Sequence, residues 1–149
     1  MTPTVEAVTR TDAGLASQLR VSVAKLARRL RSEREPSNEL SVPSIGVLAQ
    51  LFREGELTVG QLAAHERVQP PSMTRTVNCL EDGGFVVRRP SETDGRRVLV
   101  ALSDKGRDTL LADRKRRDAF LARQLKTLTP EERDLLRRVA PLIDRLATQ

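Results

Sequence analysis

Two consecutive helix signals in the middle of the chain constrain its fold more than any other feature. Thr58 and Gln61 form a capping box, in which the threonine side chain accepts from the third amide of the helix and the glutamine reaches back to the first. Two prolines then open the next helix without cost, because the first amides of a helix have no partner within it. We therefore predict two short helices joined by a tight turn, one ending at about Glu66 and one from Pro71 to Asp82.

A β-hairpin is predicted directly after these helices. Residues 85–89 and 98–102 are short apolar runs typical of strands, and the sequence Pro-Ser-Glu-Thr-Asp-Gly at 90–95 has the composition of a turn. The hairpin tip carries Arg96 and Arg97. A short extended link at 57–58 is also predicted.

Longer amphipathic helices are predicted on both sides of this centre, because apolar residues recur there every three or four positions. They cover about 15–30, 43–53, 105–127 and 130–146, and a second capping box of Thr129 and Glu132 is predicted at the start of the last. Pro141 is expected to kink the last of them. A helix of about 23 residues, as at 105–127, is too long to bury within one small lobe. We therefore favour a dimer interface for the outer apolar stripes, although the pattern alone does not separate an interface from a core.

The fold class is thus mainly α with a small β-hairpin wing, and its centre has the form of a winged helix-turn-helix. In this arrangement the second helix of the pair lies in the major groove of DNA, with its first residues at the base edges. Phosphate or base contacts are predicted for polar residues on the exposed face of that helix: Ser72, Thr74, Arg75 and Asn78. Arg96 and Arg97 are long enough to enter an adjacent minor groove, and Arg88 and Arg89 are at most phosphate contacts.

Composition supports a double-stranded nucleic acid partner. The formal net charge of the 149 residues is +6, which fits a polyanion, an acidic membrane surface or simply a solvated basic surface. Three phenylalanines and no Trp or Tyr are too few for the stacking platforms that bind single strands. Double-stranded DNA is therefore the expected partner, and no membrane association is expected.

Catalysis and cofactor binding are not expected. Cys79 and His65 are the single Cys and His, so neither a disulfide nor a structural zinc site is expected, and no catalytic set is visible. Cys79 is interpreted as an inert, half-buried residue and His65 as a surface residue. The basic run at 114–117 is interpreted as a solvated helix face, since Asp113 and Asp118 flank it. With no apolar run near about 20 residues and no signal peptide, the cytoplasm is the expected location.

The segment 57–106, LTVGQLAAHERVQPPSMTRTVNCLEDGGFVVRRPSETDGRRVLVALSDKG, resembles the MarR family of bacterial winged-helix regulators. The best matches are PPSMTR at 70–75, the Gly-ended turn at 80–84, and Asp94-x-Arg96 followed by VLVALSDKG. The resemblance implies a homodimer that binds inverted-repeat DNA, often a repressor released by a small phenolic or amphipathic ligand. It also implies that Asp94 supports Arg96 in the minor groove.

Residues 1–13 are polar and unpatterned, so we expect a flexible tail there, and the resemblance implies one MarR-like domain at 14–149. Within that domain the winged helix-turn-helix would cover about 41–102. Dimerisation helices would cover about 14–35 and 103–147.

Three positions depart from the family pattern. Gln69 stands where Ser or Asn usually caps the recognition helix, and it is a poorer cap. Arg67 stands where the turn usually has Gly, so it must accept an unfavourable backbone or change the turn. The N-terminal helix lacks the cysteine by which some members sense oxidants. Two alternatives stay open: a non-specific architectural DNA-binding protein, and a winged-helix module for protein interaction.

Overall fold

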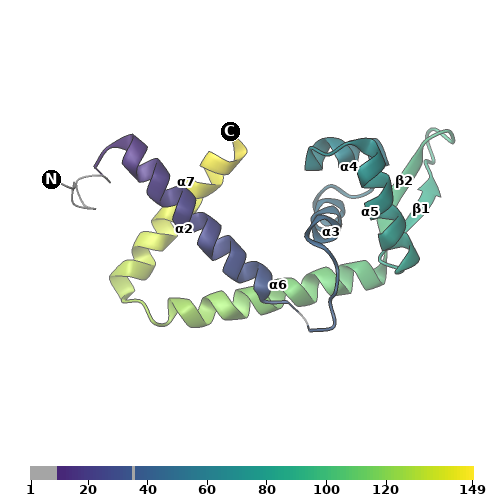
Figure 1. The fold of residues 1–149 in the computed structure, drawn as a ribbon. Coiled ribbons are helices and arrows are strands. Elements are labelled where there is room, and N and C mark those ends of the chain that lie inside the picture. The colour runs from purple at the N-terminus through teal and green to yellow at the C-terminus, as the bar shows by residue number, and fades with distance from the viewer. Residues whose placement is uncertain (1–9, 35) are drawn as a thin grey trace. The chain divides into compact units, whose positions relative to one another are not determined.

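The computed structural model describes residues 10–34 and 36–149 (Figure 1). The chain divides into two compact units. The winged unit is Glu35–Lys115, and the helical unit consists of the residues before and after it. The long helix α6 (Asp104–Leu125) begins in the winged unit and ends in the helical unit.

The winged unit contains three helices, a two-stranded sheet and the first part of α6. Its elements are α3 (Val42–Glu54), α4 (Val59–Glu66), α5 (Pro70–Asp82), β1 (Val86–Pro90) and β2 (Val98–Leu102). Their apolar faces meet in one buried cluster, because each helix exposes its polar positions and turns its apolar ones inward. The cluster is formed by Val47, Leu48, Leu51, Leu57, Leu62, Ala63, Met73, Val77, Leu80, Val86, Val100 and Leu110. The predicted mainly helical fold with a hairpin wing is confirmed.

The two strands pair antiparallel, with Val86 opposite Leu102 and Pro90 opposite Val98. Leu57 adds a single bridge to Val100, and the two residues exchange backbone hydrogen bonds of 3.2 and 2.7 Å. The extended link predicted before α4 is therefore confirmed. It ties the start of the helix pair to the wing.

Local capping fixes where the helices begin. Gln61 N–H donates to Thr58 Oγ1 at 3.1 Å, and Thr58 N–H donates to Gln61 Oε1 at 2.9 Å, so the predicted capping box of α4 is present. Some other predicted boundaries differ from the structure by one residue, which is common because helix ends often fray or shift by a residue or two. The recognition helix begins at Pro70 rather than Pro71, and the first strand covers Val86–Pro90 rather than 85–89.

The helical unit consists of α2 (Asp12–Ser32), the later part of α6 and α7 (Pro130–Thr148). Thr11 caps α2 by accepting from Gly14 N–H at 3.1 Å. Residues 12 and 13 are therefore helical, which corrects the tail predicted for 1–13. The remainder of that tail, 1–9, lies outside the described residues.

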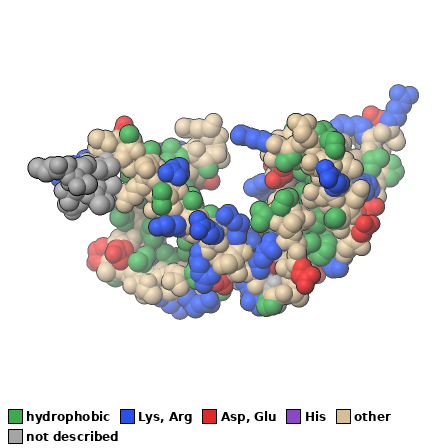
Figure 2. Space-filling model, viewed as in Figure 1, with side chains coloured by type: hydrophobic (Ala, Val, Ile, Leu, Met, Phe, Trp, Pro, Cys, Tyr) green, Lys and Arg blue, Asp and Glu red, His purple; other side chains and the backbone are tan. Residues whose placement is uncertain are grey.

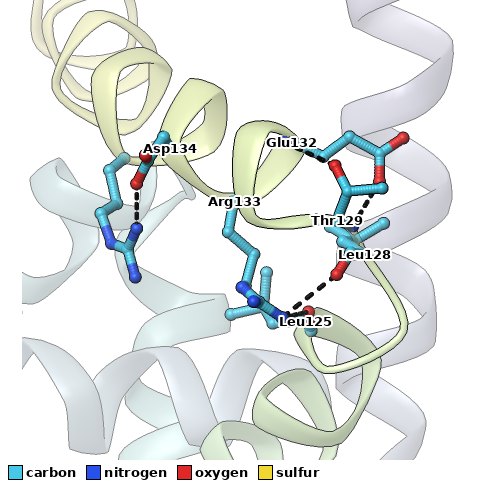
Figure 3. A network of polar contacts seen from close by, with 7 residues as sticks. Leu125, Leu128, Thr129, Glu132, Arg133 and Asp134 are labelled. Atoms are coloured by element: carbon cyan, nitrogen blue, oxygen red, sulfur yellow. Dashed lines mark hydrogen bonds and ion pairs between the residues drawn. The ribbon is translucent and has the colours of Figure 1, made fainter.

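Polar contacts hold the turn between α6 and α7 (Figure 3). Arg133 Nη1 donates to the carbonyl oxygens of Leu128 at 3.1 Å and Leu125 at 3.4 Å. Thr129 and Glu132 form the second predicted capping box, with bonds of 2.8 and 3.2 Å. The helix then continues through Pro141 to Thr148. None of the helices in the described part of the chain has the length and apolar character needed to cross a membrane.

Candidate DNA interface

The recognition helix α5 separates its apolar and polar residues onto two faces. Met73, Val77 and Leu80 are at most 2% exposed and belong to the core. The four residues predicted to contact DNA on this helix, Ser72, Thr74, Arg75 and Asn78, are all exposed. Thr74 also donates its hydroxyl to the Pro70 carbonyl at 3.0 Å, which is a local helical bond.

The turn before α5 takes the first of the two forms that the sequence left open, an unfavourable backbone at Arg67. Arg67 lies in the left-handed region at φ 53°, ψ 43°. It is the one positive-φ residue other than glycine in the part of the chain that the structure describes. Such a backbone costs roughly 1–2 kcal/mol in a residue with a Cβ. Val68 N–H donates to the Ala63 carbonyl at 3.0 Å and closes the turn.

The first turn of α5 offers few free amides. Gln69 makes no side-chain capping bond, as its residue type predicted. Two prolines follow and have no N–H, and the amides of Ser72 and Met73 both donate to the Gln69 carbonyl, at 3.0 and 3.2 Å. Contacts to DNA at this end of the helix must therefore come mainly from side chains.

The wing tip is built from local hydrogen bonds around Asp94. Its Oδ1 accepts from the backbone N–H of Arg96 at 3.1 Å, and its carbonyl accepts from Arg97 N–H at 3.0 Å. Asp94 therefore supports the backbone of the turn, while the side chains of Arg96 and Arg97 are exposed. Figure 2 shows basic side chains at this end of the hairpin.

Arg88 and Asn78, which the sequence analysis treated as separate DNA contacts, bond to each other. Arg88 Nη2 donates to Asn78 Oδ1 at 2.6 Å, and Arg88 Nη1 pairs with Glu81 Oε2 at 2.8 Å. The neighbouring Arg89 pairs with Glu56 instead. No sequence signal indicated this bridge, because its members come from two different elements.

A second connection that sequence reasoning missed joins the end of α5 to the start of α6. Lys105 Nζ donates to the Gly83 carbonyl at 2.7 Å and lies 4.5 Å from the centroid of the Phe85 ring. Ser103 Oγ donates to the Gly84 carbonyl at 2.5 Å. Gly106 lies against the Phe85 carbonyl so closely that a Cβ would overlap it. Only glycine fits at position 106.

Two interpretations of single residues are corrected. Cys79 is exposed on α5, not half-buried, because it lies on the polar face of the helix. Asp113 does not lie on a solvated face: it is 0% exposed, and its Oδ2 accepts from Asn38 Nδ2 at 2.6 Å. His65 is exposed, as predicted.

The basic run on α6 is also less solvated than predicted. The Arg114 guanidinium lies 4.7 Å from the centre of the Phe52 ring, and Arg107 stacks on the same ring at 5.4 Å. Packing on an aromatic face shields part of the arginine while its charge stays near water. Among the residues that the structure describes, no group of His, Cys, Asp and Glu side chains could hold a metal ion.

An exposed polar recognition helix, a preceding tight turn and an arginine-tipped hairpin on one unit define a winged helix-turn-helix protein of the DNA-binding class. Residues 40–98 match the model of the MarR family. The uncharacterized HTH-type transcriptional regulator Mb0904 of Mycobacterium bovis is 47% identical over 132 residues, which are 89% of this chain and 92% of the relative. The chain therefore belongs to the MarR family of transcriptional regulators.

Two further comparisons agree. The solved structure of a MarR family protein from Bacillus stearothermophilus matches with a TM-score of 0.81 and 28% identity, covering 94% of this chain and 97% of the other. The HTH-type transcriptional repressor MdtR of Bacillus subtilis is 31% identical over 124 residues, covering 79% of this chain and 78% of the repressor.

Proposed function

We propose that this protein is a homodimeric repressor that binds an inverted-repeat operator in double-stranded DNA and is released by a small ligand. The observation that carries the proposal is the joint exposure of Arg75 on α5 and of Arg96 and Arg97 at the wing tip. The first would read the major groove, and the wing arginines would enter the minor groove, where negative potential favours guanidinium. The protein would act by binding rather than by catalysis, in the cytoplasm.

The remaining predicted contacts take supporting roles in this proposal. Ser72 and Thr74 would touch phosphates or base edges near the start of α5. Asp94 would hold the wing turn rather than touch DNA, since its carboxylate already accepts from Arg96 N–H. The repressor role is supported by the relative MdtR, which is named a transcriptional repressor.

Homodimer formation is supported by apolar side chains that the single chain leaves exposed on α2 and α7. These are Leu15, Val21, Val23, Leu26, Leu135, Leu136, Leu142, Ile143 and Leu146. No residue of α7 is buried. Large exposed apolar faces on a helix indicate an interface, and a second copy would cover them symmetrically. The domain proposed at 14–149 would then use about 14–35 and 103–147 for dimerisation and about 41–102 for DNA.

The ligand response rests on a groove in the winged unit. Its volume is about 660 Å³, within the usual range for small-molecule sites. Its lining combines Phe85 and Leu40 with the polar side chains of Asn38, Lys105 and Asp108. That mixture suits a small aromatic or amphipathic effector. Calorimetric titration of phenolic ligands with and without DNA tests this part; an unchanged DNA affinity at saturating ligand would refute it.

The experiment for the main proposal is selection from a random duplex library, followed by fluorescence anisotropy near physiological salt. Enrichment of an inverted repeat, with half-site centres about one helical turn apart, would support the dimeric regulator. Tight binding without any enriched sequence would instead support the architectural alternative. No binding to any duplex would favour the protein-interaction module.

A further inference from the structure

The Arg88 side chain bridges the wing to the recognition helix. It leaves β1 and reaches two residues of α5 that lie one helical turn apart. Nη1 lies 2.8 Å from Glu81 Oε2, and Nη2 lies 2.6 Å from Asn78 Oδ1. The planar guanidinium suits this geometry, because its N–H groups point in fixed directions toward two acceptors at once. The side chains of Arg88 and Glu81 are 28% and 40% exposed, so the bridge lies at the surface rather than in the core.

This bridge is a second attachment between α5 and the wing. The first is the chain itself, where Phe85 N–H donates to the Leu80 carbonyl at 2.8 Å as the helix passes into β1. Leu80 and Val86 also belong to the same buried core, which packs the two elements together. The bridge adds a polar connection three residues after Phe85, to Asn78 and Glu81 on either side of Leu80, and so further restricts the angle between α5 and the wing at the surface.

We propose that Arg88 is a positioning residue for DNA recognition, which holds the recognition helix and the wing at a fixed mutual angle. The inference rests on the proposed DNA-binding function. Arg75 on α5 and Arg96 on the wing must meet two different grooves at the same time, so the angle between their elements determines whether both contacts form. A DNA site with the wrong spacing is then penalised, and the bridge contributes to specificity without touching a base.

Arg89 is the matched control within the same strand. It carries the same charge one residue further on, and adjacent strand residues point to opposite faces. Its partner is Glu56, which precedes α4 and does not belong to the recognition helix. Removing Arg89 changes the net charge by the same amount but leaves the attachment of α5 intact.

Glu81 separates positioning from direct phosphate contact. Glu81→Ala removes a negative charge close to the DNA-binding face. Because this charge repels the DNA phosphates, its removal alone would tighten binding to every duplex. If Glu81 instead anchors Arg88, its loss weakens binding to the operator. The two explanations therefore predict effects of opposite sign on operator affinity.

The experiment measures the dissociation constants of wild-type, Arg88→Ala, Arg88→Lys, Glu81→Ala and Arg89→Ala dimers for the selected operator and for a shuffled duplex. Surface bridges of this kind are modest, so we expect Arg88→Ala and Glu81→Ala each to lower the operator-to-shuffled affinity ratio by about threefold to fivefold. Arg88→Lys keeps the positive charge but loses the planar guanidinium that reaches two acceptors at once. We therefore expect its operator-to-shuffled affinity ratio to stay as low as that of Arg88→Ala. Arg89→Ala weakens both duplexes equally and leaves the ratio unchanged.

Other outcomes overturn the proposal. Tighter operator binding by Glu81→Ala, or full rescue by Arg88→Lys, would make Arg88 a simple phosphate contact. If Arg88→Ala and Arg89→Ala lowered the operator-to-shuffled affinity ratio equally, Arg88 would likewise be a simple phosphate contact. A wild-type protein that binds no duplex refutes the proposed function itself, and the positioning role falls with it. Melting temperatures of all variants identify any that unfold; because Glu81 is exposed, its variant keeps the test decisive if Arg88→Ala does not fold.

Discussion

The winged unit and the helical unit differ in how they bury apolar surface. In the described part of the winged unit, one core cluster encloses twelve buried apolar residues, contributed by the helices, both strands and Leu57. In the described part of the helical unit, Gly14 and Phe120 are the buried residues, and large Leu, Val and Ile side chains of α2 and α7 remain exposed. A unit without a core of its own depends on an external surface for stability. The chain therefore combines a winged unit that has its own core with a helical unit whose exposed apolar side chains are what the proposed dimer would cover.

The largest expected effect comes from charging the exposed apolar face of α7. Leu142→Asp combined with Leu146→Asp places two charges in the proposed interface, where an unpaired buried charge costs about 3–5 kcal/mol. We expect the dimer dissociation constant to rise by at least about a hundredfold, measured by sedimentation velocity.

Val87→Asp on β1 is the matched control, because Val87 is 48% exposed and Leu142 is 46% exposed. It should leave the oligomeric state unchanged. A monomeric wild-type protein, or a double variant that stays dimeric at micromolar concentration, would remove the distinction between the two units.

The next effect is on the stability of the winged unit. Gly106→Ala forces a Cβ into the Phe85 carbonyl, so the backbone must shift. We expect a loss of roughly 3 kcal/mol in the free energy of unfolding, the upper part of the range for overpacked sites. Urea denaturation followed by circular dichroism measures it.

Gly60→Ala gives the paired comparison, since its Cβ would meet only Thr58 Oγ1 at 3.9 Å. There alanine should raise stability by up to about 1 kcal/mol, because it is the better helix former. Similar losses in both variants would show that the close approach of α6 to Phe85 does not hold the wing in place.

A smaller effect sharpens the functional side of the comparison. Arg75→Ala and Arg96→Ala should each weaken operator binding by about tenfold, since a good base or groove contact contributes about 1–3 kcal/mol. Arg28→Ala removes the same charge from the helical unit and should change affinity by less than about twofold. Anisotropy at several salt concentrations measures all three. An equal loss for Arg28→Ala would mean that DNA recognition is not confined to the winged unit.

The smallest effect concerns the start of α7. Hydrogen bonds from the Glu131 backbone and from Thr129 lower the pKa of the Glu131 carboxyl below its ordinary value. A lowered pKa in the folded state stabilises the protein above the unfolded pKa, and this stabilisation is lost as the pH falls through the folded value. Glu131→Gln should therefore reduce the drop in melting temperature between pH 6 and about pH 3. An identical drop in both proteins would contradict this.

The features predicted correctly from the sequence depend on neighbours a few residues apart. Both capping boxes join residues three positions apart, so their geometry follows from the helix itself. The left-handed backbone of Arg67 and the weak cap at Gln69 are equally local. The exposed face of α5 also follows from helical periodicity. For that reason most of the fold and the exposure of the candidate DNA contacts could be predicted.

The features missed or predicted wrongly join residues far apart in the chain. Asp113 was expected on a solvated helix face, yet it is buried and bonds to Asn38, 75 positions earlier. Arg114 looked solvated because nothing local indicated that Phe52 lies beside it. The error at Cys79 is of another kind, because the helical periodicity of α5 already placed it on the exposed face. Only its interpretation as a half-buried residue was wrong.

The sequence by itself determined the order of helices and strands, the approximate helix starts, the weak cap of α5 and the polar face of the recognition helix. Each of these is set by local backbone and side-chain chemistry within about one or two helical turns. Only the tertiary structure decided that Arg88 bridges to Glu81 and Asn78, that Lys105 holds Gly83, and that Gly106 must remain glycine. These depend on how separate elements pack, which is set by the whole core at once and not by any one segment.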